Sequence, residues 1–92
     1  MLKKSDLKNK LKNGEYVIGT WCELPSPEVI NVIAKAGLDF VIIDMEHGAM
    51  DFKLASNMVM AAEVEGCSPL IRVSKNDESD ILRALEIAPA GI

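Results

Sequence analysis

The chain has 92 residues and a mass of 10.0 kDa, which suffices for one small domain or for part of one. With 49% apolar and 26% charged residues, its composition is globular and excludes the disordered, collagen-like and coiled-coil classes. No apolar run approaches the roughly 18–20 residues of a membrane span, and no apolar stretch follows Lys3 and Lys4 as in a secretory signal. We therefore expect a globular protein of the cytoplasm.

Charge is distributed unevenly along the chain. Residues 1–12 carry a net charge of +4, whereas the remaining residues carry −8, so the body of the protein is acidic. Nucleic-acid binding needs basic side chains that neutralise phosphates, so the acidic body argues against it. Leu2, Leu7 and Leu11 recur at helical spacing, so the lysine-rich start is interpreted as the solvated face of a short helix. The two cysteines are too few for a disulfide framework and are expected to be free thiols.

Apolar periodicity and turn residues divide the chain into an entry helix and three units that each pair a strand with a helix. Ser26-Pro27-Glu28 illustrates a predicted helix start, because Ser can cap, Pro fits the first helical position and Glu favours the positive end of the dipole. In chain order the predicted elements are a helix over 6–12 with Ser5 as its N-cap, a strand over 16–21, a helix from 27 to Gly37, a strand over 39–44, a helix over 51–65, a strand over 69–73, a helix from about 76 to 87, and a fourth strand that starts at Gly91-Ile92.

The second strand, over 39–44, is apolar at consecutive positions, so both of its faces are predicted to be buried, as in parallel sheets covered by helices. An open nucleotide-binding sheet would show a glycine-rich turn after its first strand, and neither G-x-G-x-x-G nor G-x-x-x-x-G-K-[ST] occurs. Three parallel strands alone would leave two bare edges. We therefore predict that residues 1–92 are the N-terminal portion of a TIM (β/α)8 barrel, ending before the fourth strand; a complete barrel takes about 250 residues.

In such a barrel the functional side chains gather at the carboxyl ends of the strands. Trp21, His47 and Arg72 are spaced by 26 and 25 residues, the length of one strand–helix unit, which predicts that they share one rim. His47 is the single histidine and follows a buried strand beside Asp44 and Glu46, where a neutral imidazole can take up and return protons. A loop histidine with structural partners, and a packing role for Trp21, are the alternatives.

Arg72 lies in an otherwise apolar strand, so its charge must be paired or must face a polar cavity. Its fork fits a carboxylate in a two-point contact; a structural ion pair with Asp44 or Glu46 is the alternative. The segment from Asp44 to His47 also resembles a metal cluster, but on an extended strand end these two residues point to different faces, which weakens that interpretation. Lys75 could form a Schiff base with a keto substrate, but a solvated loop lysine is favoured there.

Several segments of the sequence together resemble the HpcH/HpaI aldolase family. They are Gly19-Thr20-Trp21, Ser26-Pro27, Ala36-Gly37-Leu38-Asp39-Phe40, Ile43-Asp44-Met45-Glu46-His47-Gly48 with the pattern I-D-x-E-H-G, and Arg72-Val73 to Asn76-Asp77 with the pattern R-V-x-x-N-D. The resemblance covers residues 5–92 in the same order. It implies a class II, metal-dependent aldolase on a TIM barrel that cleaves 2-oxo-4-hydroxy acids into pyruvate, or a related 2-oxo acid, and an aldehyde.

The resemblance also implies roles for individual residues. His47 matches the general base of the family, and Arg72 matches the arginine that holds the keto-acid and stabilises the enolate oxygen. Trp21 is a further candidate for substrate binding, and Asp44 and Glu46 are secondary site candidates. The divalent metal of the family, Mg, Mn or Co, is held by a Glu and an Asp on later strands, so no metal ligand is expected in this chain. The acid that orients the histidine is likewise implied on a later strand.

The expected partners are a small 2-oxo acid and an aldehyde, together with further copies of the protein in a homo-oligomer; neither nucleic acid nor a membrane is expected. A hypothesis of a different class also stands. In it the 92 residues are a non-catalytic, truncated βα module, or a half-barrel fragment that completes a barrel by pairing with copies of itself.

Overall fold

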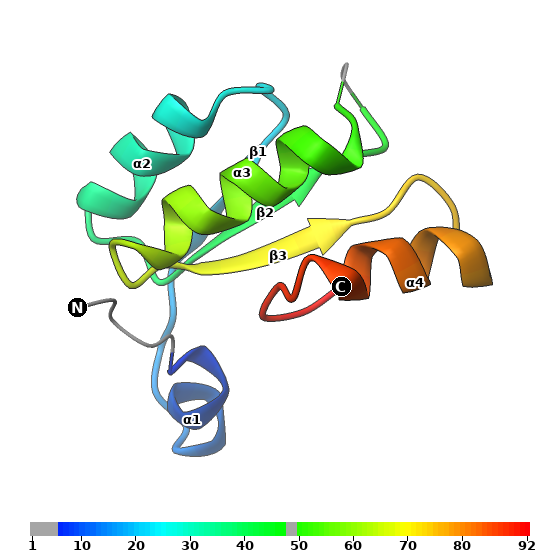
Figure 1. Ribbon diagram of the computed structural model, residues 1–92. Coiled ribbons are helices and arrows are strands. Elements are labelled where there is room, and N and C mark those ends of the chain that lie inside the picture. The colour runs from blue at the N-terminus through cyan, green and yellow to red at the C-terminus, as the bar shows by residue number, and fades with distance from the viewer. Residues whose placement is uncertain (1–5, 48–49) are drawn as a thin grey trace.

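The structure, a computed structural model, describes residues 6–47 and 50–92. The three strands form one parallel sheet in the order β1-β2-β3, with α2 and α3 side by side on one of its faces (Figure 1). Among the described residues no helix is long and apolar enough to cross a membrane. The elements in chain order are α1 (Leu7–Lys12), β1 (Gly19–Cys22), α2 (Pro27–Lys35), β2 (Phe40–Asp44), α3 (Phe52–Glu63), β3 (Ser68–Arg72) and α4 (Glu78–Glu86).

The face of the sheet beneath α2 and α3 carries the hydrophobic core. Val41, Ile43 and Ile71 are at most 1% exposed, and each such side chain stabilises the fold by about 1.5–3 kcal/mol relative to an exposed one. Cys22 and Cys67 belong to the same cluster and are free thiols, as predicted. The helices contribute mostly small or branched side chains to this core, which are Ile30, Ala34, Ala55, Met58, Val59, Ala62 and Ala84.

The opposite face of the sheet is less covered. Trp21, Ile42 and Leu70 are register partners on the three strands, so they form one row on this face. Trp21 is 49% exposed, and the other two are partly buried. Both faces of β2 were predicted to be buried. In the described part of the chain, the face towards α2 and α3 is fully buried and the opposite face is only partly covered. Asp44 and Arg72 are paired two residues further along the same face, at the carboxyl ends of β2 and β3.

Side-chain caps define where three of the helices begin. Ser26, Asp51 and Asp77 occupy the N-cap positions of α2, α3 and α4, and each side chain accepts a hydrogen bond from a backbone N–H three residues further on. Ser5, the predicted N-cap of the first helix, lies outside the described residues. Asp6 takes the N-cap position of α1, and its side chain makes no capping hydrogen bond.

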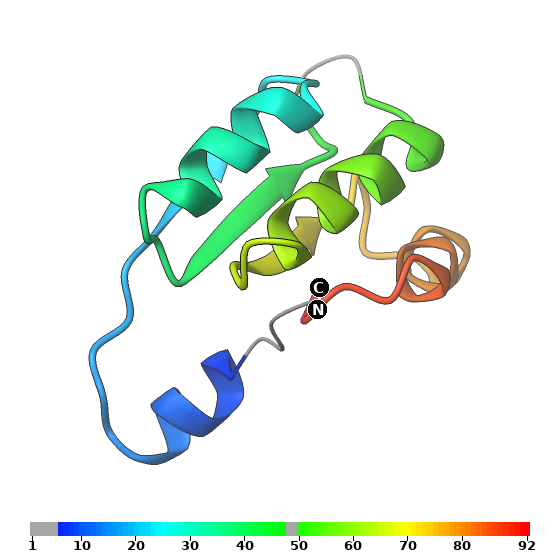
Figure 2. The same ribbon diagram turned by 60° about the vertical axis from the view of Figure 1, so that its left-hand side comes forward.

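Helix α1 stands away from the sheet, as Figure 2 shows, and none of its residues is buried. Leu11 is 56% exposed, so the predicted apolar side of this helix is not covered by the described part of the chain. Lys10 connects α1 to the sheet, because its Nζ donates a hydrogen bond to Oδ1 of Asp39 at 2.9 Å. Oδ2 of Asp39 accepts another from the backbone N–H of Ile18, also at 2.9 Å. Since Asp39 directly precedes β2, α1 is held at the amino ends of the strands.

Strand β1 begins at Gly19, three residues later than the predicted start at Tyr16. Tyr16 is 99% exposed because β2 begins only at Phe40, the register partner of Gly19, so no neighbouring strand pairs with the earlier residues. The ring of Phe40 lies against Gly19 and occupies the space that a Cβ atom would need. A glycine at this position lets β1 and β2 start together.

The chain returns to the sheet after α4, as predicted for the first step of a fourth strand. Gly91 forms a parallel bridge with Leu70, and its carbonyl accepts a hydrogen bond from the backbone N–H of Ile71 at 3.0 Å. The backbone N–H of Ala90 donates to the carbonyl of Pro69 at 2.8 Å. The order of the strands in the sheet is therefore their order in the sequence, which is the order of a barrel.

Candidate active site

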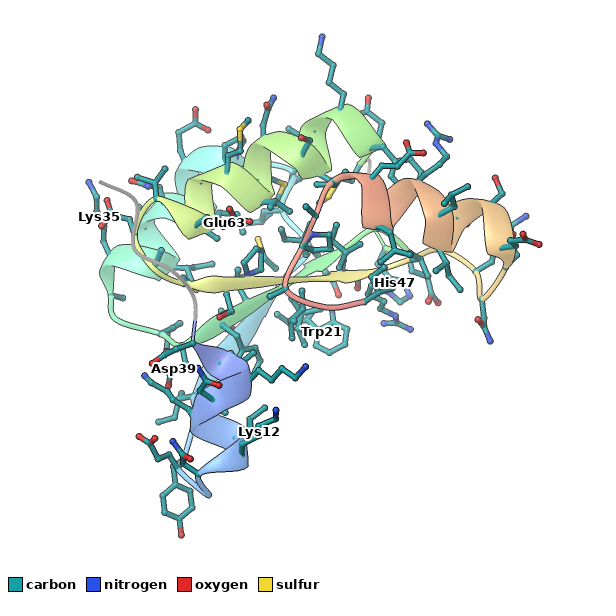
Figure 3. All side chains as sticks on the ribbon, turned by 60° about the horizontal axis from the view of Figure 1, so that its bottom comes forward. Lys12, Trp21, Lys35, Asp39, His47 and Glu63 are labelled. Atoms are coloured by element: carbon teal, nitrogen blue, oxygen red, sulfur yellow. The ribbon has the colours of Figure 1, made fainter. Side chains whose placement is uncertain are left out.

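Asp44, the last residue of β2, has a fully buried side chain at the centre of the site. Its Oδ1 accepts hydrogen bonds from the backbone N–H groups of Glu46 at 2.8 Å and His47 at 3.2 Å. Its Oδ2 accepts one from Nε1 of Trp21 at 2.8 Å and lies 3.1 Å from Nδ1 of His47. Trp21 and His47 thus lie near one end of the sheet, with Asp39 and α1 at the other (Figure 3).

The prediction that Asp44 and His47 point to different faces is wrong. It assumed that the backbone stays extended through His47, whereas β2 ends at Asp44 and the following residues turn back around its carboxylate. Asp and Asn side chains commonly close such turns by accepting hydrogen bonds from N–H groups two or three residues further on. This chain therefore supplies a carboxylate that hydrogen-bonds His47, whereas the resemblance implied such an acid on a later strand.

Asp44 acts as a permanent hydrogen-bond acceptor. Burial alone would raise its pKa, but the hydrogen bonds from Trp21 and His47 and from the N–H groups of Glu46 and His47 outweigh burial and lower the pKa to about 2. Because Asp44 is ionised at neutral pH, Nδ1 of His47 carries the proton in their shared hydrogen bond. In neutral His47 the lone pair is then on Nε2, which is free of Asp44 and available as a base.

Arg72 joins the same cluster from the end of β3. Its Nη2 lies 2.8 Å from Oε2 of Glu46, and its Nη1 lies 3.7 Å from Oδ2 of Asp44. Its guanidinium carbon lies 5.5 Å from the centre of the Trp21 ring. Both ion-pair partners considered from the sequence are therefore present. Because a guanidinium has five N–H donors, these two contacts leave donors for an anionic ligand.

Contacts between backbone and side chains join the loops that follow β2 and β3. The N–H of Met45 donates to the carbonyl of Arg72 at 2.9 Å, and Oγ of Ser74 donates to the carbonyl of Met45 at 3.1 Å. These bonds fix the ends of the two strands, and so the spacing between His47 and Arg72. Lys75 is exposed and forms no ion pair with residues 6–47 or 50–92, which agrees with a solvated loop lysine.

Glu23 is a residue to which the sequence analysis gave no role. It directly follows β1, and one carboxylate oxygen of Glu23, one of Asp44 and one ring nitrogen of His47 all lie within 4.8 Å of one another. Its position one residue beyond the strand was the available sequence signal, because side chains at that position reach the same rim.

The three groups do not compose a divalent-metal site by themselves. The carboxylate of Asp44 already accepts hydrogen bonds from two backbone N–H groups and two side chains, so its lone pairs are occupied. The Arg72 cation lies 3.7 Å from the same carboxylate and would repel a metal ion there. With Asp44 occupied, Glu23 supplies the one remaining carboxylate of the three groups, and the nitrogen of His47 suits Mg²⁺ poorly because Mg²⁺ prefers oxygen ligands.

Comparison with known proteins gives a consistent family assignment. A sequence profile of the HpcH/HpaI aldolase/citrate lyase family matches residues 17–92. A hydroxypyruvate/pyruvate aldolase of Rhizorhabdus wittichii is 34% identical over 79 residues, which are 86% of this chain and 32% of that protein. A pyruvate aldolase of Rhizobium etli is 36% identical over 80 residues, which are 87% of this chain and 32% of that protein.

The solved structures agree with the sequence comparison. The crystal structure of the citrate synthase SbnG matches 94% of this chain and 35% of its own, with a TM-score of 0.89 and 38% identity. The chain thus spans about a third of the length of the proteins it matches, and its three βα units are the N-terminal portion of a TIM barrel, as predicted. On the profile match and these identities, the chain belongs to the HpcH/HpaI aldolase/citrate lyase family.

Proposed function

We propose that these 92 residues form the keto-acid-binding part of a cytoplasmic, divalent-metal-dependent aldolase that cleaves 2-oxo-4-hydroxy acids into pyruvate and an aldehyde. One observation carries the proposal: the buried carboxylate of Asp44 gathers Trp21, His47 and Arg72 from three successive strand ends into one cluster. The names of the two relatives, a pyruvate aldolase and a hydroxypyruvate/pyruvate aldolase, support this substrate class.

His47 is the proposed general base. In the cleavage direction, Nε2 of His47 accepts the proton of the 4-hydroxyl group while the C3–C4 bond breaks, which releases the aldehyde and leaves the enolate of pyruvate. The proton is then returned to C3, which becomes the methyl group of pyruvate. The negative charge of Asp44, 3.1 Å from Nδ1, stabilises the imidazolium that forms between the two steps.

Arg72 and Trp21 are the proposed substrate-binding residues. The remaining N–H donors of Arg72 bind the keto-acid and stabilise the negative charge that develops on the enolate oxygen. Glu46, at 2.8 Å, and the ring of Trp21 restrict the guanidinium, so less conformational entropy is lost when the substrate binds. The half-exposed indole of Trp21 forms a wall beside the keto-acid.

The charge of the site supports the proposed metal dependence. Asp44 and Glu46 lie beside the guanidinium of Arg72, and Glu23 lies beside Asp44 and His47. The cluster thus has three carboxylates and one guanidinium, and its excess of negative charge opposes an anionic keto-acid. A divalent cation, Mg, Mn or Co, would offset this excess and polarise the keto group when bound. Because the described residues do not compose its site, we place its ligands, a Glu and an Asp, on later strands of a complete barrel.

The test uses the native protein that contains this sequence, supplied with Mn²⁺. Cleavage of a 2-oxo-4-hydroxy acid and exchange of the pyruvate methyl protons with solvent are measured together. His47→Ala should lower kcat by about 10²- to 10⁴-fold, the usual contribution of one general base. Arg72→Lys should lower kcat/KM by about tenfold or more, since lysine cannot reproduce a planar two-point contact.

Lys75→Met is the matched control. It should retain the activity, and borohydride should trap no adduct between the protein and pyruvate, because the proposed reaction uses no Schiff base. If Arg72→Lys kept the kcat/KM of the original protein, the role of Arg72 in substrate binding would be wrong, and its ion pairs with Glu46 and Asp44 would be purely structural.

A non-catalytic, self-associating module is the second candidate. It is favoured by the sheet face opposite α2 and α3, which is only partly covered in the described part of the chain. This candidate predicts an oligomer that exchanges no pyruvate protons at any concentration of Mn²⁺. The aldolase predicts exchange by a homo-oligomer, so one sample examined by both sedimentation and exchange distinguishes the two.

A further inference from the structure

The order of the strands arranges the site residues in a line along the rim. Arg72 ends β3, His47 follows β2, and Glu23 follows β1, and the sheet order is β1-β2-β3. Under the proposed function, Arg72 holds the keto-acid end of the substrate and His47 works at the bond that breaks. A substrate extended along this rim therefore has its aldehyde portion closest to the end of β1, where Glu23 is located.

Glu23 differs from the other two carboxylates of the cluster. The charge of Glu46 is offset by Arg72 at 2.8 Å, and Asp44 is buried among donors. Glu23 is exposed and forms no ion pair with any residue that the structure describes, although its carboxylate lies within 4.8 Å of the site atoms of Asp44 and His47. It is thus the accessible, unneutralised negative charge at this end of the rim.

We propose that Glu23 selects the aldehyde partner by charge, favouring an uncharged hydroxyaldehyde over one that carries a carboxylate. This inference rests on the proposed function. A carboxylate offers only hydrogen-bond acceptors, so it binds the hydroxyl groups of the aldehyde and repels a second carboxylate at the same position. Like charges placed together at an interface are a general means of rejecting an unwanted partner.

The test compares two aldehydes of two carbons each. Glycolaldehyde carries a hydroxyl group where glyoxylate carries a carboxylate, so their ratio of kcat/KM in aldol addition to pyruvate reports charge selection at constant chain length. The measurement uses the native protein with Mn²⁺. Glu23→Gln, which removes the charge and keeps the shape, should shift the ratio towards glyoxylate by about threefold to a hundredfold, the range for two charges about 6 Å apart between the dielectric constants of bulk water and of a protein surface.

Glu63→Gln is the matched control and should leave the ratio unchanged, because Glu63 lies towards the end of the molecule opposite His47 (Figure 3). Pyruvate proton exchange, which needs no aldehyde, is measured on the unsubstituted protein. If exchange occurs and Glu23→Gln shifts the ratio, the inference is supported. If exchange occurs and the ratio is the same in both proteins, charge selection by Glu23 is wrong while the proposed function stands.

Two further results would overturn the inference. If the unsubstituted protein exchanged no pyruvate protons, the proposed function would fail and charge selection with it. If Glu23→Gln lowered kcat/KM equally for both aldehydes and raised the Mn²⁺ concentration needed for half-maximal rate, Glu23 would be a residue of the metal site rather than of aldehyde selection.

Discussion

A carboxylate without contact to solvent remains ionised only where hydrogen-bond donors replace the water it has lost. Four donors surround Asp44, two of them side chains at the proposed active site, Trp21 and His47. The same bonds that keep Asp44 charged therefore fix the indole and the imidazole. Stability and site geometry depend here on one residue.

The lowered pKa of Asp44 predicts a pH dependence of the unfolding free energy. The pKa is about 2 in the folded protein, against about 3.9 in an unfolded chain. A depressed pKa contributes stability that is fully present above about pH 5 and is lost as the pH falls through the unfolded pKa towards the folded pKa of about 2; here it amounts to about 2–3 kcal/mol. We expect Asp44→Asn to remove this part of the pH dependence in urea unfolding of the native protein between pH 5 and pH 2.

Asp51→Asn is the control, because asparagine caps a helix about as well as aspartate and the substitution also removes one carboxyl group. It should retain the dependence that Asp44→Asn loses. If the unfolding free energy instead changed with pH equally in the Asp44→Asn variant and in the original protein, that result would show that the four hydrogen bonds do not lower the pKa of Asp44.

Ala88 has a φ of 61° and is the one residue other than glycine with a positive φ in the described parts of the chain. It follows the C-cap of α4, the position that glycine commonly fills because a Cβ atom is strained there. We expect Ala88→Gly to raise the unfolding free energy by about 0.5–1 kcal/mol, measured by urea unfolding.

Ala36→Gly tests the opposite case, since Ala36 caps α2 at a φ of −69° and glycine there should only lower stability. A loss of stability in both variants would contradict strain at Ala88.

Within residues 6–47 and 50–92, helix α1 is joined to the sheet by one ion pair, that between Lys10 and Asp39. No residue of α1 is buried, and Lys10 reaches Asp39 at 2.9 Å. The side chains of this pair are partly exposed, at 34% and 23%, so salt screens the pair and weakens it. We expect Lys10→Met to increase protease cleavage between residues 13 and 18 severalfold while the sheet stays intact, and added salt to have the same effect on the original protein. Lys12→Met removes a charge from the same helix and leaves the Lys10–Asp39 pair intact, so the protease should cleave this variant at the rate of the original protein. If the protease cleaved the two variants at equal rates, the ion pair would not be the attachment of α1.

Helix α2 begins at the predicted residue, and α3 and α4 begin within about two residues of their predicted starts, because capping is a local interaction. Ser26 and Asp77 act on N–H groups three residues away, so their function needs no tertiary structure. Which side of a helix becomes buried depends on tertiary contacts and not only on neighbouring residues in the sequence. Val32 is apolar but 68% exposed, because the buried residues of α2 are Ile30 and Ala34. In the same way, β1 starts at Gly19 because pairing depends on where β2 begins.

At the scale of the whole molecule, the sheet lacks closure. The described residues leave β1 without a neighbour on its outer side. They cover the apolar row of Trp21, Ile42 and Leu70 only in part, and Trp21 is 49% exposed. Bare edges and apolar faces associate in water. We expect the isolated 92-residue chain to sediment as a dimer or larger species at micromolar concentration, and its unfolding midpoint to rise with concentration. A compact monomer that unfolds cooperatively at every concentration would contradict this and show that three βα units suffice as a fold.

The sequence by itself determined the layout of this protein. The consecutive apolar residues of the second strand, the helix caps and the constant length of the βα units fixed a parallel sheet, and that spacing brought Trp21, His47 and Arg72 to one rim. These features depend on neighbours within a few residues or on the period of a repeated unit, so they can be read without coordinates.

The tertiary structure alone decided which of the rim residues meet. The hydrogen bond between Asp44 and His47 exists because the chain turns where the strand ends, and that turn is closed by the carboxylate itself. The contact of Arg72 with Glu46, and the position of Glu23 beside the cluster, depend on the register of three strands and on the directions of loop side chains. Such directions follow from contacts between residues more than twenty positions apart, which no local pattern in the sequence records.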